Sequence, residues 1–470
     1  MHMSKAPQPD DLSHHAAGGR RADSVERLPA TCAATPAVEL GHAGDHLLVL
    51  KFLSQVKQKA IDEDFQSRLD QPSYRPSDRL LIRRNNNVAA HVQLCSHVAW
   101  YRGQRIPAVA LADFAVLPEY KGGAIESALL AAAESTARQE GAAVALVRTT
   151  DQQWFSGQGW TRLCGQGYTR ANPRHILASI DVPRSDALPR SRVVVAVLSW
   201  RHYELDAIRH SSALPASQMW GALRRSETWW QWLVGRKAGE QILMAVLRGQ
   251  ASNGRPRTAS LSPTTMPADF AAGAAFSNAG AVGYAVVRDS RIVEMFTRPG
   301  WEVVRSHLLA RACRDAIDRG HHAVSLLTSA DEPLHEVLVT AQGQWIRHDA
   351  TRDGVWMFKR LGVEKWVAKM YPVFQDRAHS ASIARPVHID FAAEGENHQF
   401  TLTRRSARWE TLASQENPIC CTGEELQSLL ASNLRQPAQA LNGSRGQTSA
   451  IEGLFPLELF WRSPFEYLRL

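Results

Sequence analysis

The amino-acid sequence predicts an α+β protein made of two units of similar architecture and a small third domain. One helix-and-strand segment occurs twice, strand-like alternation precedes both copies, and the composition changes after residue 362. A chain of 470 residues is also too long for a single hydrophobic core and fits about three domains. We therefore expect a tail at 1–40, two units at 41–185 and 186–362, and a third domain at 363–470.

The N-terminal tail is expected to be disordered. Its sequence, MHMSKAPQPDDLSHHAAGGRRADSVERLPA, has almost no large apolar side chain and cannot bury enough surface to offset the entropy lost on ordering. No apolar run typical of a secretory signal follows Met1, and no later stretch reaches the roughly 18 uninterrupted apolar residues of a membrane span. We expect neither a secreted protein nor one that spans a membrane.

The cysteine and histidine patterns point away from metal chemistry. The six cysteines are scattered, which fits neither a zinc site nor a disulfide framework and favours reduced thiols in a cytoplasm. The adjacent histidine pairs, at 14–15 and 321–322, lack a third ligand at a recognisable spacing. We expect no metal. The cysteines are Cys32, Cys95, Cys164, Cys313, Cys420 and Cys421.

The charge balance suits an anionic partner in general. The chain has 54 basic and 46 acidic residues, a formal net charge of +8 and a pI of about 9.3. The basic residues are dispersed rather than clustered, so nucleic acid is not the expected partner. The sequence contains no P-loop, nucleophile elbow or dinucleotide fingerprint.

The first unit reads as strands, a turn with two glycines, and a helix. The segment RLLIRRNNNVAAHVQLCSHVAWYRGQRIPAVALADFAVL alternates like antiparallel strands joined by a tight YRGQ turn. The turn PEYKGG and the helical pattern AIESALLAAAESTARQEG follow, and AAVALVRT then reads as a buried strand. We expect the helix to end at Gly141.

The second unit repeats this pattern. Leu308–Thr328 matches Leu129–Thr149 without gaps at an offset of 179 residues, with identities that include both leucine pairs and the glycines Gly141 and Gly320. The segments EQILMAVLRG and GAVGYAVVRDSRIVEMFT upstream read as strands. A Trp-rich stretch before both segments, ETWWQWLV, has Trp229, Trp232 and Leu233 at helical spacing, which favours a buried helix face over a surface that lines a cavity or stacks on a ligand.

The third domain begins after a linking helix, MFKRLGVEKWVAKMYPVFQDR. It mixes short alternating segments such as HIDFAAEGENHQFTLTRR with an amphipathic helix, TGEELQSLLASNL, in which Thr422 and Glu425 stand in a capping-box relation. A proline- and aromatic-rich end follows. This composition predicts a small α+β domain.

The stretch VLPEYKGGAIESALL, followed by a strand and WFSGQGW, resembles the GNAT superfamily of acetyl-CoA-dependent N-acetyltransferases. The wider arrangement is similar to the enhanced intracellular survival branch, which has two tandem GNAT units and a sterol-carrier-protein-like C-terminal domain. The resemblance implies acetyl-CoA as co-substrate and a small-molecule or peptide amine as acceptor. It also implies a homo-oligomer, since the branch forms hexamers.

The resemblance implies where the cofactor lies. Pantetheine would lie along the strand end, and the pyrophosphate would meet the N–H groups at the start of the next helix, where the dipole is positive. Val116, Pro118 and Lys121 match the family pattern, but Ala124 stands where the family has glycine and Glu126 where it has glycine or alanine. The implied cofactor-binding residues are Phe114, Ala115, Val116, Lys121, Gly122, Gly123, Ala124, Ile125, Glu126 and Ser127.

Two departures bear on catalysis. The tyrosine that commonly protonates the CoA thiolate in the family is here Phe155, and the hydroxyl of the adjacent Ser156 is a poor acid. Two bases are open: the terminal carboxylate of Leu470, which the branch uses, and Asp113. The central unit's turn, TRPGWEVV, has Trp301 and Glu302 in place of a glycine pair, so we expect no CoA there.

Two functions therefore stay open. One is an acetyl-CoA-dependent N-acetyltransferase that acts on a primary amine. The other is a protein that keeps the fold without the chemistry and binds acyl-CoA, or an apolar ligand in its third domain, as a scaffold.

Overall fold

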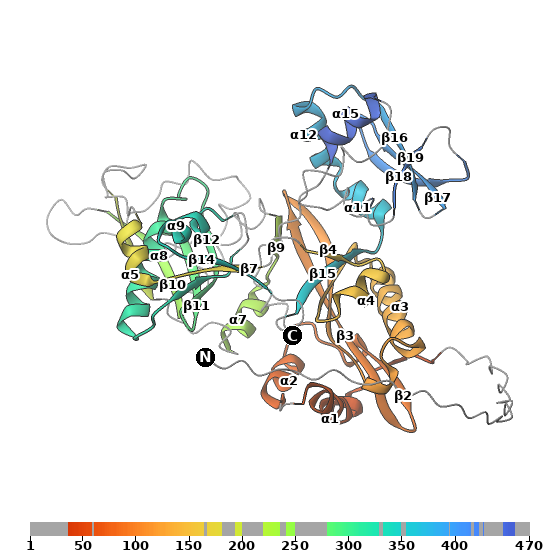
Figure 1. The fold of residues 1–470 in the computed structure, drawn as a ribbon, viewed down its shortest axis with the longest axis horizontal. Coiled ribbons are helices and arrows are strands. Elements are labelled where there is room, and N and C mark those ends of the chain that lie inside the picture. Colours follow the sequence, from red (N-terminus) through yellow and green to blue (C-terminus); the bar gives the residue numbers. More distant parts are fainter. Residues whose placement is uncertain are drawn as a thin grey trace, which may run out of the picture. The chain divides into compact units, whose positions relative to one another are not determined.

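Three β-sheets with flanking helices make up the described part of the protein in a computed structural model (Figure 1). Residues 1–35 of the predicted tail and the predicted base Leu470 lie outside the described residues. The structure describes residues 36–58, 61–163, 167–180, 193–199, 220–235, 241–249, 280–328, 332–348, 354–393, 395–414, 418–422, 426 and 445–455.

The first sheet carries the predicted strand, turn and helix. Its order is β1 (Glu39–Leu40), β2 (Arg79–Arg84), β3 (Asn87–Tyr101), β4 (Gln104–Val116), β5 (Val144–Thr149), β15 (Val355–Arg360) and β6 (Thr161–Arg162), and β9 (Trp220–Leu223) pairs with β3. The strands β2, β3 and β4 are antiparallel, whereas β4 and β5 are parallel.

Helix α3 (Ala124–Gln139) makes the parallel crossover from β4 to β5. Its apolar stripe, which includes Leu129, Leu130 and Ala133, packs on one face of this sheet. The helix is followed by Gly141 with a φ of 85°, the left-handed conformation that glycine adopts without cost. On the other face lie α1 (His46–Lys57) and α2 (Asp62–Leu69), which bury Phe52 and Phe65.

The second sheet confirms the internal repeat. Its order is β14 (Gln344–Arg347), β7 (Gly167–Ala171), β13 (Val324–Leu326), β12 (Arg291–Thr297), β11 (Ala281–Arg288), β10 (Gln241–Gly249) and β8 (Val193–Ser199). Helix α8 (Val304–Asp318) connects the parallel strands β12 and β13, as α3 connects β4 and β5, and Gly320 follows it with a φ of 76°. The shorter helices α5 (Pro173–Ser179) and α9 (Leu334–Thr340) pack in the same core.

The two sheets exchange a strand. The strand β7, which follows β6 in the chain, pairs with β13 and β14 in the second sheet. Conversely β15, which follows β14, pairs with β5 and β6 in the first. Each sheet is therefore completed by a strand that follows, along the chain, a strand of the other sheet. The domain boundaries at 185 and 362 stay predictions.

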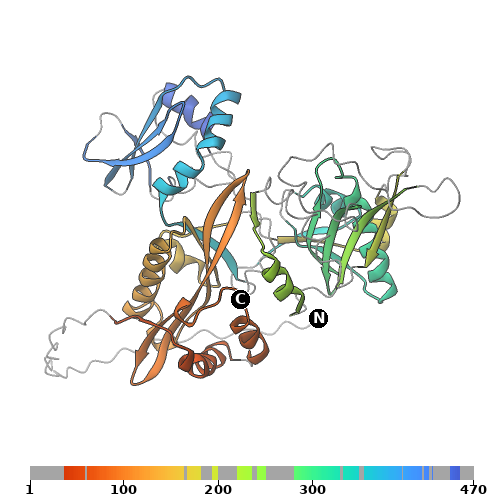
Figure 2. The same cartoon turned by 180° about the vertical axis from the view of Figure 1, so that it is seen from behind.

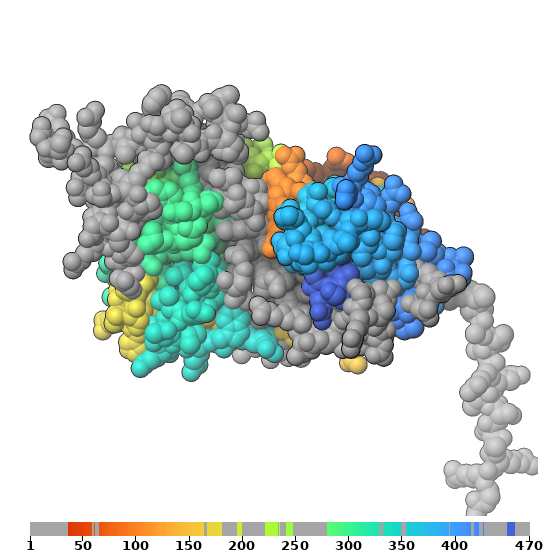
Figure 3. All heavy atoms as spheres, turned by 90° about the horizontal axis from the view of Figure 1, so that it is seen from above, coloured from red at the N-terminus to blue at the C-terminus, as the bar shows by residue number. Residues whose placement is uncertain are grey.

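The third sheet belongs to the C-terminal part (Figure 2). Its order is β18 (Ala407–Leu412), β17 (Glu396–Leu402), β16 (Val387–Ala393) and β19 (Ile419–Cys420), with helices α11 (Val363–Lys369), α12 (Tyr371–Ser380) and α15 (Arg445–Leu454). Phe374, Phe400 and Phe455 meet in its core, with centroid separations of 4.9–5.3 Å. Figure 3 shows the outer atoms of this domain in blue. The prediction of a small third α+β domain fits this arrangement.

Across the described residues, no helix combines the length and apolar character needed to cross a membrane. The same residues contain no group of three or more side chains placed to hold a metal ion.

We expect residues 36–185, expressed alone, not to fold cooperatively. This fragment contains β5 but lacks β15, so Val355, Met357 and Phe358 no longer cover the strand. Burial of each such side chain contributes roughly 1.5–3 kcal/mol. Thermal unfolding followed by circular dichroism measures the effect.

The matched control is the same fragment with residues 354–361 attached through a glycine–serine linker, which restores the missing strand. If the bare fragment unfolds as sharply and at the same temperature as the control, β15 does not have this stabilising role.

Candidate functional site

The pairing of β4 with β5 stops before either strand ends. The parallel ladder runs from Ala108↔Val144 to Leu111↔Val147, while β4 continues to Val116 and β5 to Thr149. Beyond Leu111 the β5-facing edge of β4 is therefore not used by this ladder. Backbone N–H and C=O groups that a sheet leaves unpaired can bind an extended ligand as if it were a further strand.

A β-bulge lies in the same stretch of β4. On the β3 side, His91 pairs with Ala115 and Gln93 with Ala112, so Asp113 and Phe114 together oppose a single residue of β3. Asp113 has a φ of 50°, in the left-handed region that few residues other than glycine occupy. Bulges bend a strand and redirect its backbone groups.

The carboxylate of Asp113 is held by two cations. Its oxygens form ion pairs with Lys57, the last residue of α1, and Arg68, near the end of α2. The Asp113 side chain is only 2% exposed. These contacts give the carboxylate a structural partner on each oxygen, and its predicted role as base stays a prediction.

The carbonyl of Asp113 is held by a buried histidine. Arginine can only donate, so the Nη1 of Arg79 donates to the Nε2 of His91 at 3.0 Å, and the Nδ1–H of His91 donates to the Asp113 carbonyl at 3.1 Å. Burial of the ring and the nearby charge of Arg79 hold the pKa of His91 well below its ordinary value. His91 is therefore neutral, with one defined tautomer.

The predicted phosphate turn lies directly beyond β4. A 3₁₀ turn (Pro118–Tyr120) leads to Gly122, with a φ of 70°, and to Gly123, which precedes the first residue of α3. Lys121, Gly122, Gly123 and Ala124 are exposed. The exposed N-terminus of a helix of this length offers backbone N–H groups and a positive dipole to an anion.

Glu126 folds back onto this turn. Its carboxylate accepts the backbone N–H of Gly122 at 2.5 Å, and the residue is buried. Ile125 beside it is buried in the sheet core, and Ser127 is partly buried. The carboxylate therefore occupies one of the donors that the sequence assigns to a phosphate.

The second unit has a similar contact at its own turn. Glu302 accepts the backbone N–H of Gly300 at 2.9 Å, and Gly300 has a φ of 81°. In both units, the backbone N–H of a glycine with a positive φ donates to a glutamate carboxylate near the start of the crossover helix.

Phe155 belongs to an aromatic cluster beside the bulge. Its ring centroid lies 5.4 Å from Phe114, 4.8 Å from Trp154 and 5.6 Å from Trp160. Phe155 is buried, whereas Ser156, the alternative acid, is exposed. The cluster therefore places apolar rings next to the β4 stretch predicted to bind the thioester. Phe155 has no hydroxyl that could act as an acid there.

A buried carboxylate on α3 holds this region together, and no sequence motif indicates it. Glu134 accepts hydrogen bonds from the Nε1 of Trp160 at 2.9 Å and from the Nζ of Lys359 at 2.8 and 2.9 Å. Lys359 lies on β15, the exchanged strand. The contact thus ties the crossover helix to a strand more than two hundred residues away, which no local pattern reveals.

The Trp-rich stretch forms α7 (Glu227–Gly235), with a correction to its buried face. Trp229, Trp230 and Leu233 are buried, whereas Trp232 is partly buried and donates its Nε1–H to the Ser67 carbonyl of α2 at 2.9 Å. Trp230 rather than Trp232 faces the core of the second sheet because it packs on Tyr284.

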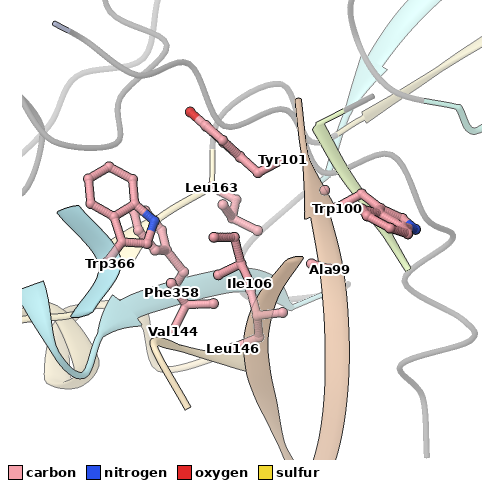
Figure 4. A pocket seen from close by; sticks show the side chains of 10 residues that line it. Ala99, Trp100, Tyr101, Ile106, Val144, Leu146, Leu163, Phe358 and Trp366 are labelled. Carbon is pink, nitrogen blue, oxygen red and sulfur yellow. The ribbon is translucent and has the colours of Figure 1, made fainter. Parts of the chain in front are cut away.

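An apolar pocket lies at the far end of the β4–β5 ladder from the bulge (Figure 4). Its empty volume is about 450 Å³, part of it open to solvent. None of the predicted cofactor residues lines it. The lining residues are Ala99, Trp100, Tyr101, Ile106, Val144, Leu146, Leu163, Gly221, Phe358 and Trp366.

Solved acyltransferase structures match the chain over most of its length. A GCN5-related N-acetyltransferase from Anabaena variabilis is 13% identical, with a TM-score of 0.62, and the match covers 89% of this chain and 97% of that one. A probable N-acyltransferase from Enterococcus faecalis is 11% identical, with a TM-score of 0.61, and the match covers 91% of this chain and 97% of that one. Eis1 from Mycobacterium abscessus is 13% identical, with a TM-score of 0.58, and the match covers 92% of this chain and all of that one (100%).

This likeness confirms the predicted fold. The chain has the α+β architecture of these GNAT proteins, with two crossover units in tandem. No protein-family profile and no curated protein matches the sequence. The resemblance of the third domain to sterol carrier proteins is not confirmed and stays a prediction.

We expect Lys359→Met to lower the free energy of unfolding by about 3 kcal/mol. The substitution leaves the buried carboxylate of Glu134 without its principal cation, and removing one partner of a buried ion pair is costly. Chemical denaturation measures the loss.

Arg138→Met is the matched control, because Arg138 also pairs with Glu134 but is 46% exposed. Solvent screening should keep its effect below about 1 kcal/mol. Equal losses of unfolding free energy in the two variants would show that the Lys359 ion pair stabilises the protein no more than the exposed Arg138 pair.

Proposed function

We propose that the protein is an acetyl-CoA-dependent N-acetyltransferase that acts on a primary amine. The early end of the β4–β5 ladder at Leu111↔Val147 carries the proposal, because it leaves the edge of β4 from Ala112 to Val116 outside that ladder, next to a helix N-terminus. An extended thioester and an anionic pyrophosphate need these two features in this order. The shared fold supports the same reaction class.

The co-substrate would lie from β4 to the start of α3. Phe114, Ala115 and Val116 would pair with pantetheine through their backbone, and the exposed turn at 121–124 would meet the pyrophosphate. Lys121 would add a positive charge. Phosphate binding at this turn requires the Glu126 carboxylate to leave the Gly122 N–H.

The proposed chemistry is direct transfer between two bound substrates. A base takes a proton from the ammonium, the amine attacks the thioester, and backbone N–H groups of β4 stabilise the negative charge on the carbonyl oxygen. Phe155 cannot protonate the leaving thiolate, so the proton comes from elsewhere. The proposed base is the terminal carboxylate of Leu470, and the carboxylate of Asp113 is the alternative tested below.

A non-catalytic acyl-CoA-binding scaffold is the second candidate. Two observations favour it: Glu126 occupies a donor of the phosphate turn, and Phe155 lies in an apolar cluster where the family commonly has an acid. We also propose that the protein forms a homo-oligomer, that its third domain is sterol-carrier-like and can bind an apolar ligand, and that it is located in the cytoplasm. None of them decides between the two candidates.

Acetyl-CoA binding and transfer separate the two functions. We expect calorimetry to detect acetyl-CoA binding, and CoA release with a panel of polyamines, aminoglycosides and lysine peptides to detect transfer. Binding without CoA release across the panel would favour the scaffold. Failure to bind at hundreds of micromolar would remove the transferase.

We expect Glu126→Gln to tighten acetyl-CoA binding about fivefold. The substitution removes a negative charge beside the phosphate turn, and repulsion between charges about 4 Å apart in water is roughly 1 kcal/mol. Calorimetry in low salt gives the two dissociation constants.

Glu119→Gln is the control, because Glu119 is an exposed carboxylate in the preceding turn that makes no such contact with Gly122. Equal gains in both variants would assign the effect to net charge. No gain in Glu126→Gln would show that the pyrophosphate binds elsewhere.

A further inference from the structure

We propose that Asp113 and His91 are positioning residues that fix the bulge of β4 and aim the N–H of Phe114 at the acyl thioester. In this inference, which rests on the proposed function, Asp113 is not the base. Its carboxylate instead links the bulge to α1 and α2.

The backbone at Asp113 needs an external restraint. Residues other than glycine in the left-handed region are strained and persist only when their surroundings hold them, and Asp113 is in that region. Asparagine and aspartate tolerate this conformation better than most residues, but glycine would adopt it without cost. The presence of aspartate therefore points to a use for its side chain.

The restraint acts on both ends of the residue. His91 holds the carbonyl from β3, and Lys57 and Arg68 hold the carboxylate from the two helices on that face. The Asp113 carbonyl and the Phe114 N–H belong to one planar trans peptide, so they point in opposite directions. Because the carbonyl is directed at the His91 ring, the Phe114 N–H points away from that ring. In our proposal it faces the edge of β4 beyond Leu111, where the ladder with β5 has ended.

The tautomer that supplies this hydrogen bond is set by a buried chain. Arg79 occupies the Nε2 of His91, and its own Nε donates to the Tyr74 hydroxyl at 3.0 Å. His46 of α1 contacts that hydroxyl at 2.7 Å. Arg79 also lies over the ring of Phe65 of α2, 4.7 Å from its centroid. The donor at Nδ1 is thus fixed by residues from both helices and from β2.

The same contacts make Asp113 a poor proton acceptor. Each carboxylate oxygen faces a cation, and the side chain is almost fully buried. A proton taken up here would leave Lys57 and Arg68 without their counter-charge in a buried site. An incoming ammonium would also have to approach a group already surrounded by positive charge.

The test compares two isosteric changes at His91. Asparagine places an amide N–H near the Nδ1 position, whereas glutamine places it near Nε2. The probes are acetyl-CoA labelled with ¹³C at the thioester carbonyl and unacylated CoA. We measure the infrared carbonyl stretch of the bound thioester and the ratio of the two affinities, with circular dichroism to show that each variant folds.

We expect wild type to shift the bound carbonyl stretch to lower frequency and to prefer acetyl-CoA over CoA. His91→Asn should keep most of the shift. His91→Gln should lose it, with a threefold to tenfold smaller preference for acetyl-CoA and unchanged CoA affinity, as expected for the loss of one hydrogen bond. Equal carbonyl shifts in wild type, His91→Asn and His91→Gln would overturn the inference.

Asp113 variants separate positioning from proton transfer. Asp113→Asn keeps a residue that tolerates the left-handed backbone but removes the charge, and should retain measurable turnover with an unchanged pH profile. Asp113→Ala should lose the carbonyl shift. If Asp113→Asn keeps the shift yet abolishes turnover, Asp113 is the base and the inference fails, while the transferase proposal stands. If wild type does not bind acetyl-CoA, the proposed function fails first.

Discussion

The structure of the candidate site depends on the point at which β4 and β5 stop pairing. A parallel ladder normally uses every backbone group between its strands, so a ligand can enter only where the ladder ends. Here it ends at Leu111↔Val147, and the bulge at Asp113 follows at once. The crossover helix α3 then begins where β4 has finished. Edge, bulge and helix N-terminus therefore fall in sequence along one short stretch of chain.

Buried charges keep this stretch in place from two sides. Asp113 is bound to α1 and α2, and Glu134 binds α3 to β15 and to Trp160. Both carboxylates lie where apolar packing alone would leave the relative position of helix and sheet adjustable. A buried carboxylate with several fixed donors allows far fewer arrangements. The exchanged strand matters for this reason: it supplies Lys359 as well as a hydrophobic edge.

The two units share one architecture but differ in the turn before the crossover helix. Each crossover helix follows a left-handed glycine whose N–H is taken by a glutamate, Glu126 or Glu302. Among the described residues, both units have a bulged strand that runs on beyond its parallel ladder, but only the first unit follows it with a glycine pair. The second ends its turn in Trp301 and pairs β12 with β13 near the start of β12. The chain after it supplies β15 to the first sheet, and its Trp-rich helix α7 contacts α2 through Trp232.

The sequence by itself determined the fold class, the tandem repeat and the location of the turn before α3. These features are local: alternation, helical spacing and glycines such as Gly141 are legible within about twenty residues. Tertiary structure decided the rest. His91 and Gln93 alternate with apolar residues on β3, yet both are buried, and Phe52 of α1 lies beside His91. The exchange of β7 and β15, and the partners of Asp113 and Glu134, arise from contacts between distant segments, which no local pattern encodes.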